Sequence, residues 1–136
     1  MTADLWMLLS LALLTELLTL PPLVARSSVP GGIRWIFYNR DTELAGVPPW
    51  GGRAVRAHSN LADNLAIYAV VIGLAHFTGA TNGVTQVAGM VLLIARVLHA
   101  IIYIVGIPYL RTAAFAVAQV AMLVYVWQTI VHFMAR

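Results

Sequence analysis

Four long apolar runs determine most of what this chain can fold into. Each is close to the roughly 20 residues that an α-helix needs to cross about 30 Å of hydrocarbon. The runs cover approximately residues 5–24, 53–77, 84–105 and 112–134. Of all residues, 61% are hydrophobic and only 10% are charged, whereas about a quarter of the residues in a soluble domain are charged. We therefore predict one all-α membrane domain over residues 1–136, folded as an antiparallel bundle of four transmembrane helices.

The arginines are concentrated on one side of the predicted bundle. The only long connection, residues 26–52, faces this side, whereas the turn at 78–83 on the other side has no arginine. The arginines of the first side are Arg26, Arg34, Arg40, Arg53, Arg56 and Arg111, and Arg136 lies on the opposite side. By the positive-inside rule, we expect a multi-pass protein of the cell inner membrane, with the long connection in the cytoplasm and both termini outside, in the periplasm. The stretch "RWIFYNR" in this connection is expected to place its aromatic rings at headgroup level.

Polar side chains recur at helical spacing inside three of the apolar runs. Residues three or four apart share one helix face, so these groups are expected to face the bundle interior together. An unpaired charge in the middle of the membrane costs at least about 2.5–3.5 kcal/mol, so each charge needs a partner or a function. The set comprises Arg53, Arg56, Asn60, Asp63 and Asn64 in the second run, Arg96, His99 and Tyr103 in the third, and Arg111 and Thr112 in the fourth.

Depth along antiparallel helices predicts that Asp63 and Arg96 meet. Counted from Arg53 and Gly106, each lies about 15 Å from the arginine-rich end at a rise of about 1.5 Å per residue. We therefore predict a structural ion pair between them, within one subunit or across a subunit interface. Such a pair can serve only to fix the register of the helices, or it can belong to a functional site, and the sequence leaves both roles open.

Nearer the arginine-rich end, two guanidinium groups, one amide and one hydroxyl are expected at a similar depth in the membrane. These groups are Arg56, Asn60, Tyr103 and Arg111. This combination is typical of a site for a polar anionic ligand. The alternative for His99, as for His58, is a helix histidine that is satisfied within the bundle. No HExxH pattern and no clustered carboxylates occur, so we expect no metal site, and the arginines are too scattered to indicate nucleic-acid binding.

The sequence resembles the MAPEG family, membrane-associated proteins in eicosanoid and glutathione metabolism. Two stretches carry the resemblance, "RAVRAHSNLADNL" and "IARVLHAIIYIVGIPYLRTAAFAVAQ". Their specific parts are R-A-H-x-N early in the second run, A-R-x-x-H-x-x-x-Y in the third, and Leu-Arg at the start of the fourth. The resemblance covers residues 53–119 closely and the whole chain loosely. It implies a homotrimer of four-helix subunits in membrane lipid, with glutathione bound at subunit interfaces near the cytoplasmic side.

The resemblance also implies roles for individual side chains. Arg111 matches the family's catalytic arginine, which is held against the glutathione thiol, and Thr112 stands where some members place a serine hydroxyl near the same sulfur. The positions that match the family's glutathione pocket are Arg26, Arg56, Asn60, Asp63, His99 and Tyr103. Two positions depart from the family pattern, because Ser59 replaces an arginine of some prostaglandin-synthase-like members and Asp63 replaces the usual glutamate. The first change removes a carboxylate clamp, and the second alters the reach of a ligand contact.

Activating the thiol of glutathione has a definite energetic requirement. A thiol with an ordinary pKa near 8.5 gives only a few per cent of thiolate at neutral pH. Lowering that pKa by about two units needs about 2.7 kcal/mol, and one guanidinium about 4 Å away supplies about 4 kcal/mol at an effective dielectric of about 20, before desolvation costs. We expect Arg111 to supply this stabilisation. The thiolate would attack an apolar electrophile or a lipid hydroperoxide, and transferase, peroxidase and isomerase activities differ in this second substrate.

Two other functions are compatible with part of the sequence. Glu16 lies midway along the first apolar run, where a proton-coupled small multidrug transporter would carry its single membrane carboxylate. Arginines deep in the helices argue against it, because they would repel a cationic cargo, and Glu16 is more simply a protonated or paired carboxyl inside the trimer. The second alternative is a non-catalytic protein with the MAPEG fold that binds lipid or a thiol.

Overall fold

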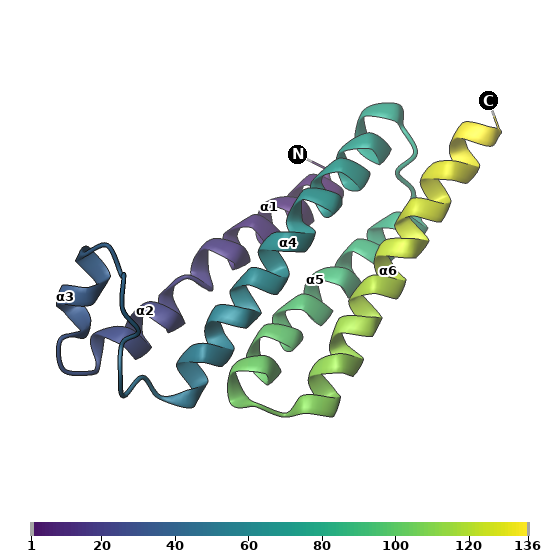
Figure 1. Cartoon of the computed structure of the whole chain (residues 1–136). Helices are drawn as coiled ribbons and strands as arrows, with labels where there is room; N and C mark the ends of the chain where they lie inside the picture. Colours follow the sequence, from purple (N-terminus) through teal and green to yellow (C-terminus); the bar gives the residue numbers. More distant parts are fainter. Residues whose placement is uncertain (1, 136) are drawn as a thin grey trace.

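The structure is a computed structural model that describes residues 2–135, and these residues form six helices (Figure 1). The helices are α1 (Ala3–Leu17), α2 (Leu20–Ser27), α3 (Gly32–Phe37), α4 (Pro49–Thr78), α5 (Gly83–Val105) and α6 (Pro108–Met134). Four segments are long and apolar enough to cross a membrane: α1 and α2 together, α4, α5 and α6. The chain is therefore a multi-pass membrane protein, and the predicted all-helical bundle of four spans is confirmed.

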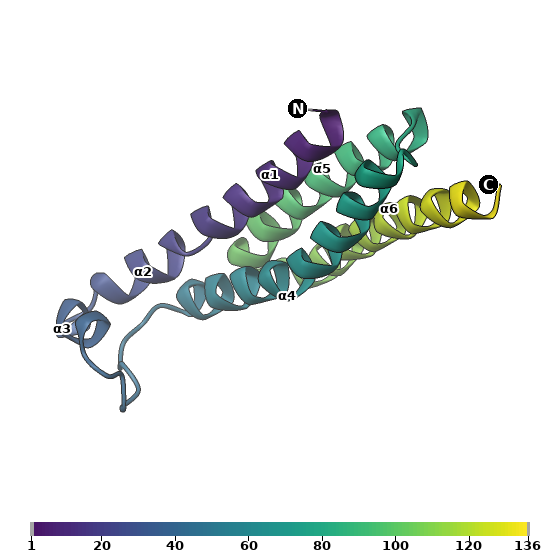
Figure 2. The ribbon, with the colours of Figure 1, turned by 90° about the horizontal axis from the view of Figure 1, so that it is seen from above.

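The four spans lie beside one another and alternate in direction (Figures 1 and 2). α5 and α6 form a long antiparallel hairpin, α1 and α4 both pack against α5, and α2 packs against α4. The hairpin turns at Gly106, whose φ of 97° is a left-handed conformation that favours glycine and ends α5. α1 begins at the same end of the bundle at which α6 ends (Figure 1). The other end, which carries Arg26, Arg53 and Arg111, is called the arginine end below.

Prolines set helix boundaries that the apolar pattern alone misplaces. α4 begins at Pro49 and α6 at Pro108, each about one turn before the predicted start, because proline is preorganised for the first turn of a helix. Pro21 and Pro22 occupy the first turn of α2. Proline has no N–H to donate and clashes with the carbonyl of the preceding turn. The apolar run predicted at 5–24 therefore becomes two successive helices that together form one span.

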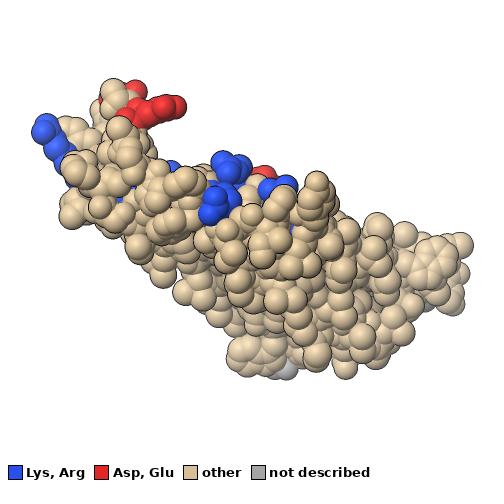
Figure 3. Space-filling view, turned by 90° about the horizontal axis from the view of Figure 1, so that it is seen from below, with Lys and Arg blue, Asp and Glu red and all other residues tan. Residues whose placement is uncertain are grey.

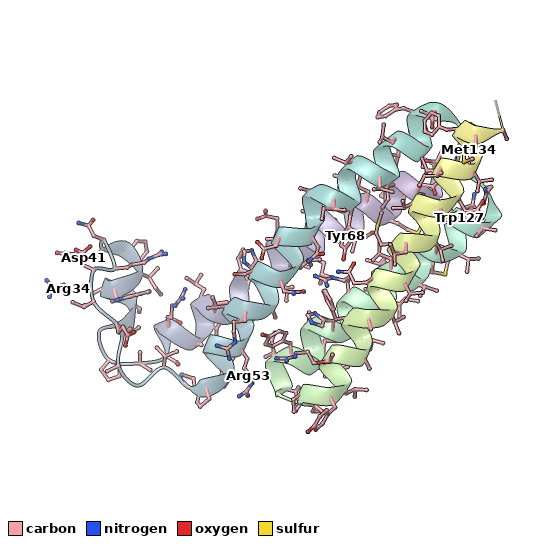
Figure 4. The ribbon with its side chains drawn as sticks, turned by 45° about the vertical axis from the view of Figure 1, so that its right-hand side comes forward. Arg34, Asp41, Arg53, Tyr68, Trp127 and Met134 are labelled. Atoms are coloured by element: carbon pink, nitrogen blue, oxygen red, sulfur yellow. The ribbon has the colours of Figure 1, made fainter. Side chains whose placement is uncertain are left out.

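The core of the bundle consists largely of alanine and a few larger apolar side chains. The outer surface of the bundle is apolar as well. Leu61, Ile72 and Leu92 are fully buried, and alanines fill much of the remaining core. Tyr68 points into the bundle, whereas Trp127, which is 62% exposed, lies on its outside (Figure 4). Apolar surface of this extent is suited to contact with lipid or with a neighbouring subunit.

The connection predicted as an interfacial loop contains α3. This short helix folds back against the end of α2, and it follows Gly31, whose φ is 76°. A Cβ atom on Gly32 would lie 1.8 Å from the backbone oxygen of Arg26, so this close approach requires glycine. Phe37 and Tyr38 are 84% and 63% exposed. They are therefore free to contact a membrane surface, as the sequence predicts.

A buried carboxylate ties α1 to α6 at the end opposite the arginine end. Asp4 is only 1% exposed, and it accepts a hydrogen bond from the hydroxyl of Tyr125, which is fully buried. A buried carboxylate without such a donor is costly. This contact therefore stabilises the position of α1 on the α5–α6 hairpin.

We expect Tyr125→Phe to lower the free energy of unfolding by about 1–3 kcal/mol, because Asp4 would stay buried without its donor. Thermal unfolding of the detergent-solubilised protein, followed by circular dichroism, measures the change. Tyr109→Phe is the matched control, since Tyr109 is 90% exposed, and it should unfold like the wild type. Equal unfolding temperatures for Tyr125→Phe and the wild type would show that the hydrogen bond contributes nothing.

Candidate functional site

A cleft between α4, α5 and α6 brings together five of the predicted site residues near the arginine end. Its volume is about 190 Å³, and it is called the Arg111 cleft below. The lining residues are Asn60 from α4, His99 and Tyr103 from α5, and Arg111, Thr112 and Phe115 from α6. The structure therefore joins the motif of the second apolar run to those of the third and fourth.

The guanidinium of Arg111 lies over an aromatic ring. Its Cζ is 4.5 Å from the ring centroid of Tyr103, which is a cation–π distance. The ring of His99 meets the same tyrosine edge-on, at a centroid distance of 5.4 Å and an interplanar angle of 87°. Within residues 2–135, the Arg111 side chain contacts no carboxylate. Its N–H donors thus remain available to an anionic ligand.

Thr112 lines the cleft, but its hydroxyl already has an acceptor. The hydroxyl donates to the backbone oxygen of Pro108 at 3.2 Å, a bond that threonine commonly makes to the preceding helical turn. A ligand sulfur could receive a hydrogen bond from Thr112 only if this bond were released.

Phe115 is the lining residue that sequence analysis missed. It follows Arg111 by one helical turn, and its ring centroid is 5.8 Å from that of His99. The same ring contacts Arg96, whose Cζ is 5.6 Å from the centroid. The spacing of four residues from Arg111 was an available signal, but a phenylalanine within an apolar run is usually a core or lipid-facing residue.

Arg96 is buried beside this cleft with few partners. It is 1% exposed, its Nη2 donates to the backbone oxygen of Asn60 at 3.0 Å, and its Cζ lies 5.8 Å from the ring centroid of Tyr68. Among the described residues, Nε and Nη1 of Arg96 have no hydrogen-bond partner, and neither do the side-chain oxygens of Asn60 and Tyr68. Buried polar atoms without partners are uncommon, so this part of the bundle is unusually polar for a membrane interior.

The predicted ion pair between Asp63 and Arg96 is not formed within the protomer. Asp63 is exposed on α4, and no described carboxylate contacts Arg96. Arg53 lies beside Gly106, as the depth count assumes, and it donates to the last carbonyl oxygens of α5 at 2.9 and 3.4 Å. The long side chain of Arg96 instead donates to the backbone oxygen of Asn60 at 3.0 Å. A carboxylate of another subunit could reach the buried guanidinium only if the helices moved apart.

A second cleft opens on the other side of α4. Its volume is about 320 Å³, and it is called the Arg26 cleft below. The lining residues are Thr19, Pro22, Leu23, Arg26, Arg40, Val55 and His58. His58 and Asn60 are two residues apart on one helix, so their side chains point in nearly opposite directions. The protomer therefore does not bring Arg26 together with the residues of the Arg111 cleft.

Two other predicted ligand-binding residues line neither cleft. Arg56 and Asp63 share the face of α4 that carries Asn60, and both are exposed there. They flank the Arg111 cleft along the helix without contributing to its wall. Glu16 is exposed on the outer surface of the first span, so the protomer does not enclose this carboxylate as a transport site would.

An apolar groove of about 640 Å³ lies between α5 and α6, towards the end opposite the arginine end. Its walls are glycine, alanine and valine residues of 83–91 and 116–124. This groove contains no side chain that can bind an anion or transfer a proton.

The sequence matches the MAPEG family over residues 5–131, which is nearly the whole chain. The chain belongs to the MAPEG family. No curated protein sequence matches it. MAPEG proteins are a family of glutathione-related membrane enzymes, so the relationship predicted from the motifs is confirmed. The matched residues include every wall of the Arg111 cleft and of the Arg26 cleft in this MAPEG protein.

We expect Arg96→Met to leave the free energy of unfolding of the ligand-free protein unchanged or to raise it by up to about 4 kcal/mol. The reason is that a buried guanidinium with few partners is costly to desolvate. Asp63→Asn and the double variant complete a double-mutant cycle, in which thermal unfolding in detergent measures each variant. The changes in the free energy of unfolding of the two single variants should add up to that of the double variant. A coupling above about 0.5 kcal/mol, together with destabilisation by Arg96→Met, would instead establish an ion pair between subunits.

Proposed function

We propose that this MAPEG protein is a glutathione-dependent transferase or peroxidase in which Arg111 stabilises the thiolate of glutathione. One observation carries the proposal: the Arg111 guanidinium lines a cleft without carboxylates, where it lies over the ring of Tyr103 and no described carboxylate pairs with it. In the transferase reaction, the sulfur forms a bond to an electrophilic carbon and the leaving group departs with its electron pair. In the peroxidase reaction, the sulfur bonds to the terminal oxygen of a lipid hydroperoxide, the O–O bond breaks, and the lipid alkoxide leaves and takes a proton to become an alcohol. A second glutathione then attacks the sulfenic acid, which gives glutathione disulfide and water. Either co-substrate is apolar and reaches the site from the membrane.

The dimensions of the Arg111 cleft support a site that a second subunit completes. Its 190 Å³ is below the roughly 300 Å³ at which pockets for small-molecule ligands usually begin, so it cannot enclose a tripeptide alone. In a cyclic trimer, each interface joins one face of a protomer to a different face of the next protomer. In the proposed homotrimer, the Arg111 cleft of one subunit meets the Arg26 cleft of its neighbour, and glutathione lies between them.

The charges around this composite site match the groups of glutathione. Arg56 binds the carboxylate of the glutamate end and Asp63 accepts its ammonium, since both are exposed on the Asn60 face of α4. Arg26 comes from the neighbouring subunit and faces the other end of the ligand. Thr112 donates to the sulfur after leaving its backbone acceptor. The remaining contacts come from Asn60, His99 and Tyr103.

The distribution of charge supports an orientation with this site open to the cytoplasm. Figure 3 shows charged side chains from the end that carries α3 to about the middle of the molecule, and no charged side chain of the described residues beyond that on this face. These charges include those of the arginine end. By the positive-inside rule, the arginine end faces the cytoplasm and both termini lie outside, as proposed for a multi-pass protein of a cell inner membrane.

We expect Arg111→Ala to retain glutathione binding but to lose thiolate formation, because the guanidinium acts on the sulfur and other residues hold the carboxylates. Titration with glutathione in detergent measures binding, and the ultraviolet absorbance of the bound thiolate measures its ionisation. Arg34→Ala is the matched control, because Arg34 is an arginine that stacks on a tyrosine, Tyr38, and does not line the Arg111 cleft. Equal thiolate absorbance in Arg111→Ala and the wild type would remove Arg111 from this role.

Activity assays on the same purified proteins distinguish an enzyme from a non-catalytic binding protein. Purified wild type should conjugate glutathione to chlorodinitrobenzene or reduce a lipid hydroperoxide, and Arg111→Ala should do neither. Binding of glutathione without either reaction, across a panel of apolar electrophiles, would favour the non-catalytic alternative.

A further inference from the structure

Arg40 lies in the connection after α3 and reaches the Arg26 cleft, although the sequence assigned it only to the charge bias of this side. It lines this cleft together with Arg26 and His58. The indole ring of Trp35 contacts both arginines: the Cζ of Arg26 is 5.2 Å from the ring centroid and the Cζ of Arg40 is 5.5 Å from it. Two like charges are therefore held against one ring at the wall of one cleft.

The backbone adopts an unfavourable conformation to place Arg40 there. Its φ is 62°, and among the described residues it is the one non-glycine residue with a positive φ. Nη2 of Arg40 donates to the backbone oxygen of Ile36 at 3.1 Å, and Nε1 of Trp35 donates to the backbone oxygen of Thr42 at 2.6 Å. These bonds fix the chain on both sides of Arg40. Strained residues that are held in this way cluster at ligand-binding and active sites.

The charged side chains that line the Arg26 cleft are arginines, and Glu43 lines an adjoining cavity that shares Arg26 with it. No acidic residue is among the lining residues of the Arg26 cleft, and neither Arg26 nor Arg40 contacts a described carboxylate. A cleft lined by charges of one sign concentrates ions of the opposite sign, and arginine binds carboxylates through its fork of N–H donors. We infer that Arg40 binds a carboxylate of glutathione in this cleft, an assignment that rests on the proposed function.

The same charges select which carboxylate Arg40 binds. Glutathione has an isolated carboxylate on its glycine and a second one beside the ammonium of its glutamate. Arg26 and Arg40 would repel the ammonium, whereas Asp63, on the Asn60 face of α4, attracts it. Arg40 therefore binds the glycine carboxylate, and it makes the site specific for a thiol peptide that ends in a free carboxylate.

The test compares Arg40→Asn with Arg34→Asn, each in the full chain in detergent. Asparagine tolerates a positive φ, so Arg40→Asn removes the guanidinium while the backbone keeps its conformation. Arg34 is the matched control, because it stacks on Tyr38 at 4.9 Å and lines neither cleft. The two ligands are glutathione and its glycine monoethyl ester, and calorimetry measures the affinity of each variant for each ligand.

We expect Arg40→Asn to weaken the binding of glutathione about tenfold or more, which is the size of the loss of a charge-assisted hydrogen bond. The ester should bind the wild type more weakly than glutathione does, and Arg40→Asn should not weaken it further. Arg34→Asn should bind both ligands like the wild type. Unchanged glutathione affinity in Arg40→Asn, or an equal loss for both ligands, would overturn the assignment and leave the proposed function intact. Failure of the wild type to bind glutathione would overturn both.

Discussion

Arginine within an apolar bundle is the constraint on which the rest of this structure depends. A guanidinium that leaves water needs acceptors, aromatic rings or an anion, because an uncompensated charge in hydrocarbon is costly. Here the partners are backbone oxygens and rings, and no carboxylate of the described residues contacts these guanidinium groups. In the membrane-spanning helices these arginines are Arg26, Arg53, Arg96 and Arg111, and the exposed Arg34 and Arg40 make similar contacts outside them. One end of the bundle thus keeps a positive potential that an external anion can neutralise.

The second constraint is the position of α4 between two clefts. Its polar residues near the arginine end do not all share one face, since His58 faces the Arg26 cleft and Asn60 faces the Arg111 cleft. Small residues allow the neighbouring helices to approach closely, as at Gly51, where an added Cβ would lie 2.6 Å from the Cβ of Ala25. A single protomer therefore presents two partial sites that point apart. Assembly of like subunits around an axis is the simplest way to join them.

The fold was predictable because the length and composition of the apolar runs leave few alternatives, and the site was predictable in part. Helical periodicity placed Asn60, His99, Tyr103 and Arg111 on faces that do meet. Asp63 and Arg96 do not pair within a protomer, because Asp63 is exposed whereas the Arg96 side chain is buried and donates to the backbone oxygen of Asn60.

The loop residues of the Arg26 cleft were not predictable in the same way. Arg40 lines this cleft and Trp35 contacts both of its arginines, and the two residues are positioned by a short helix, by a close approach at Gly32 and by the positive φ of Arg40. None of these features produces a periodic pattern in the sequence. Phe115 was missed for a different reason, since an aromatic residue in an apolar run has the same pattern whether it lines a site or contacts lipid.

Mixed assembly tests most directly whether the anion site is shared between subunits. Arg111→Ala chains lack the thiolate-stabilising half of the site, and Arg26→Glu chains lack a cation of the other half. Each variant expressed alone should give no glutathione thiolate absorbance. Co-expression in equal amounts should restore roughly a quarter of the wild-type absorbance. In random cyclic trimers, about a quarter of the interfaces join a subunit that keeps Arg111 to a neighbour that keeps Arg26. Absorbance no higher than in a mixture of the two separately purified variants would contradict the account, since it would place both halves of the site on one chain.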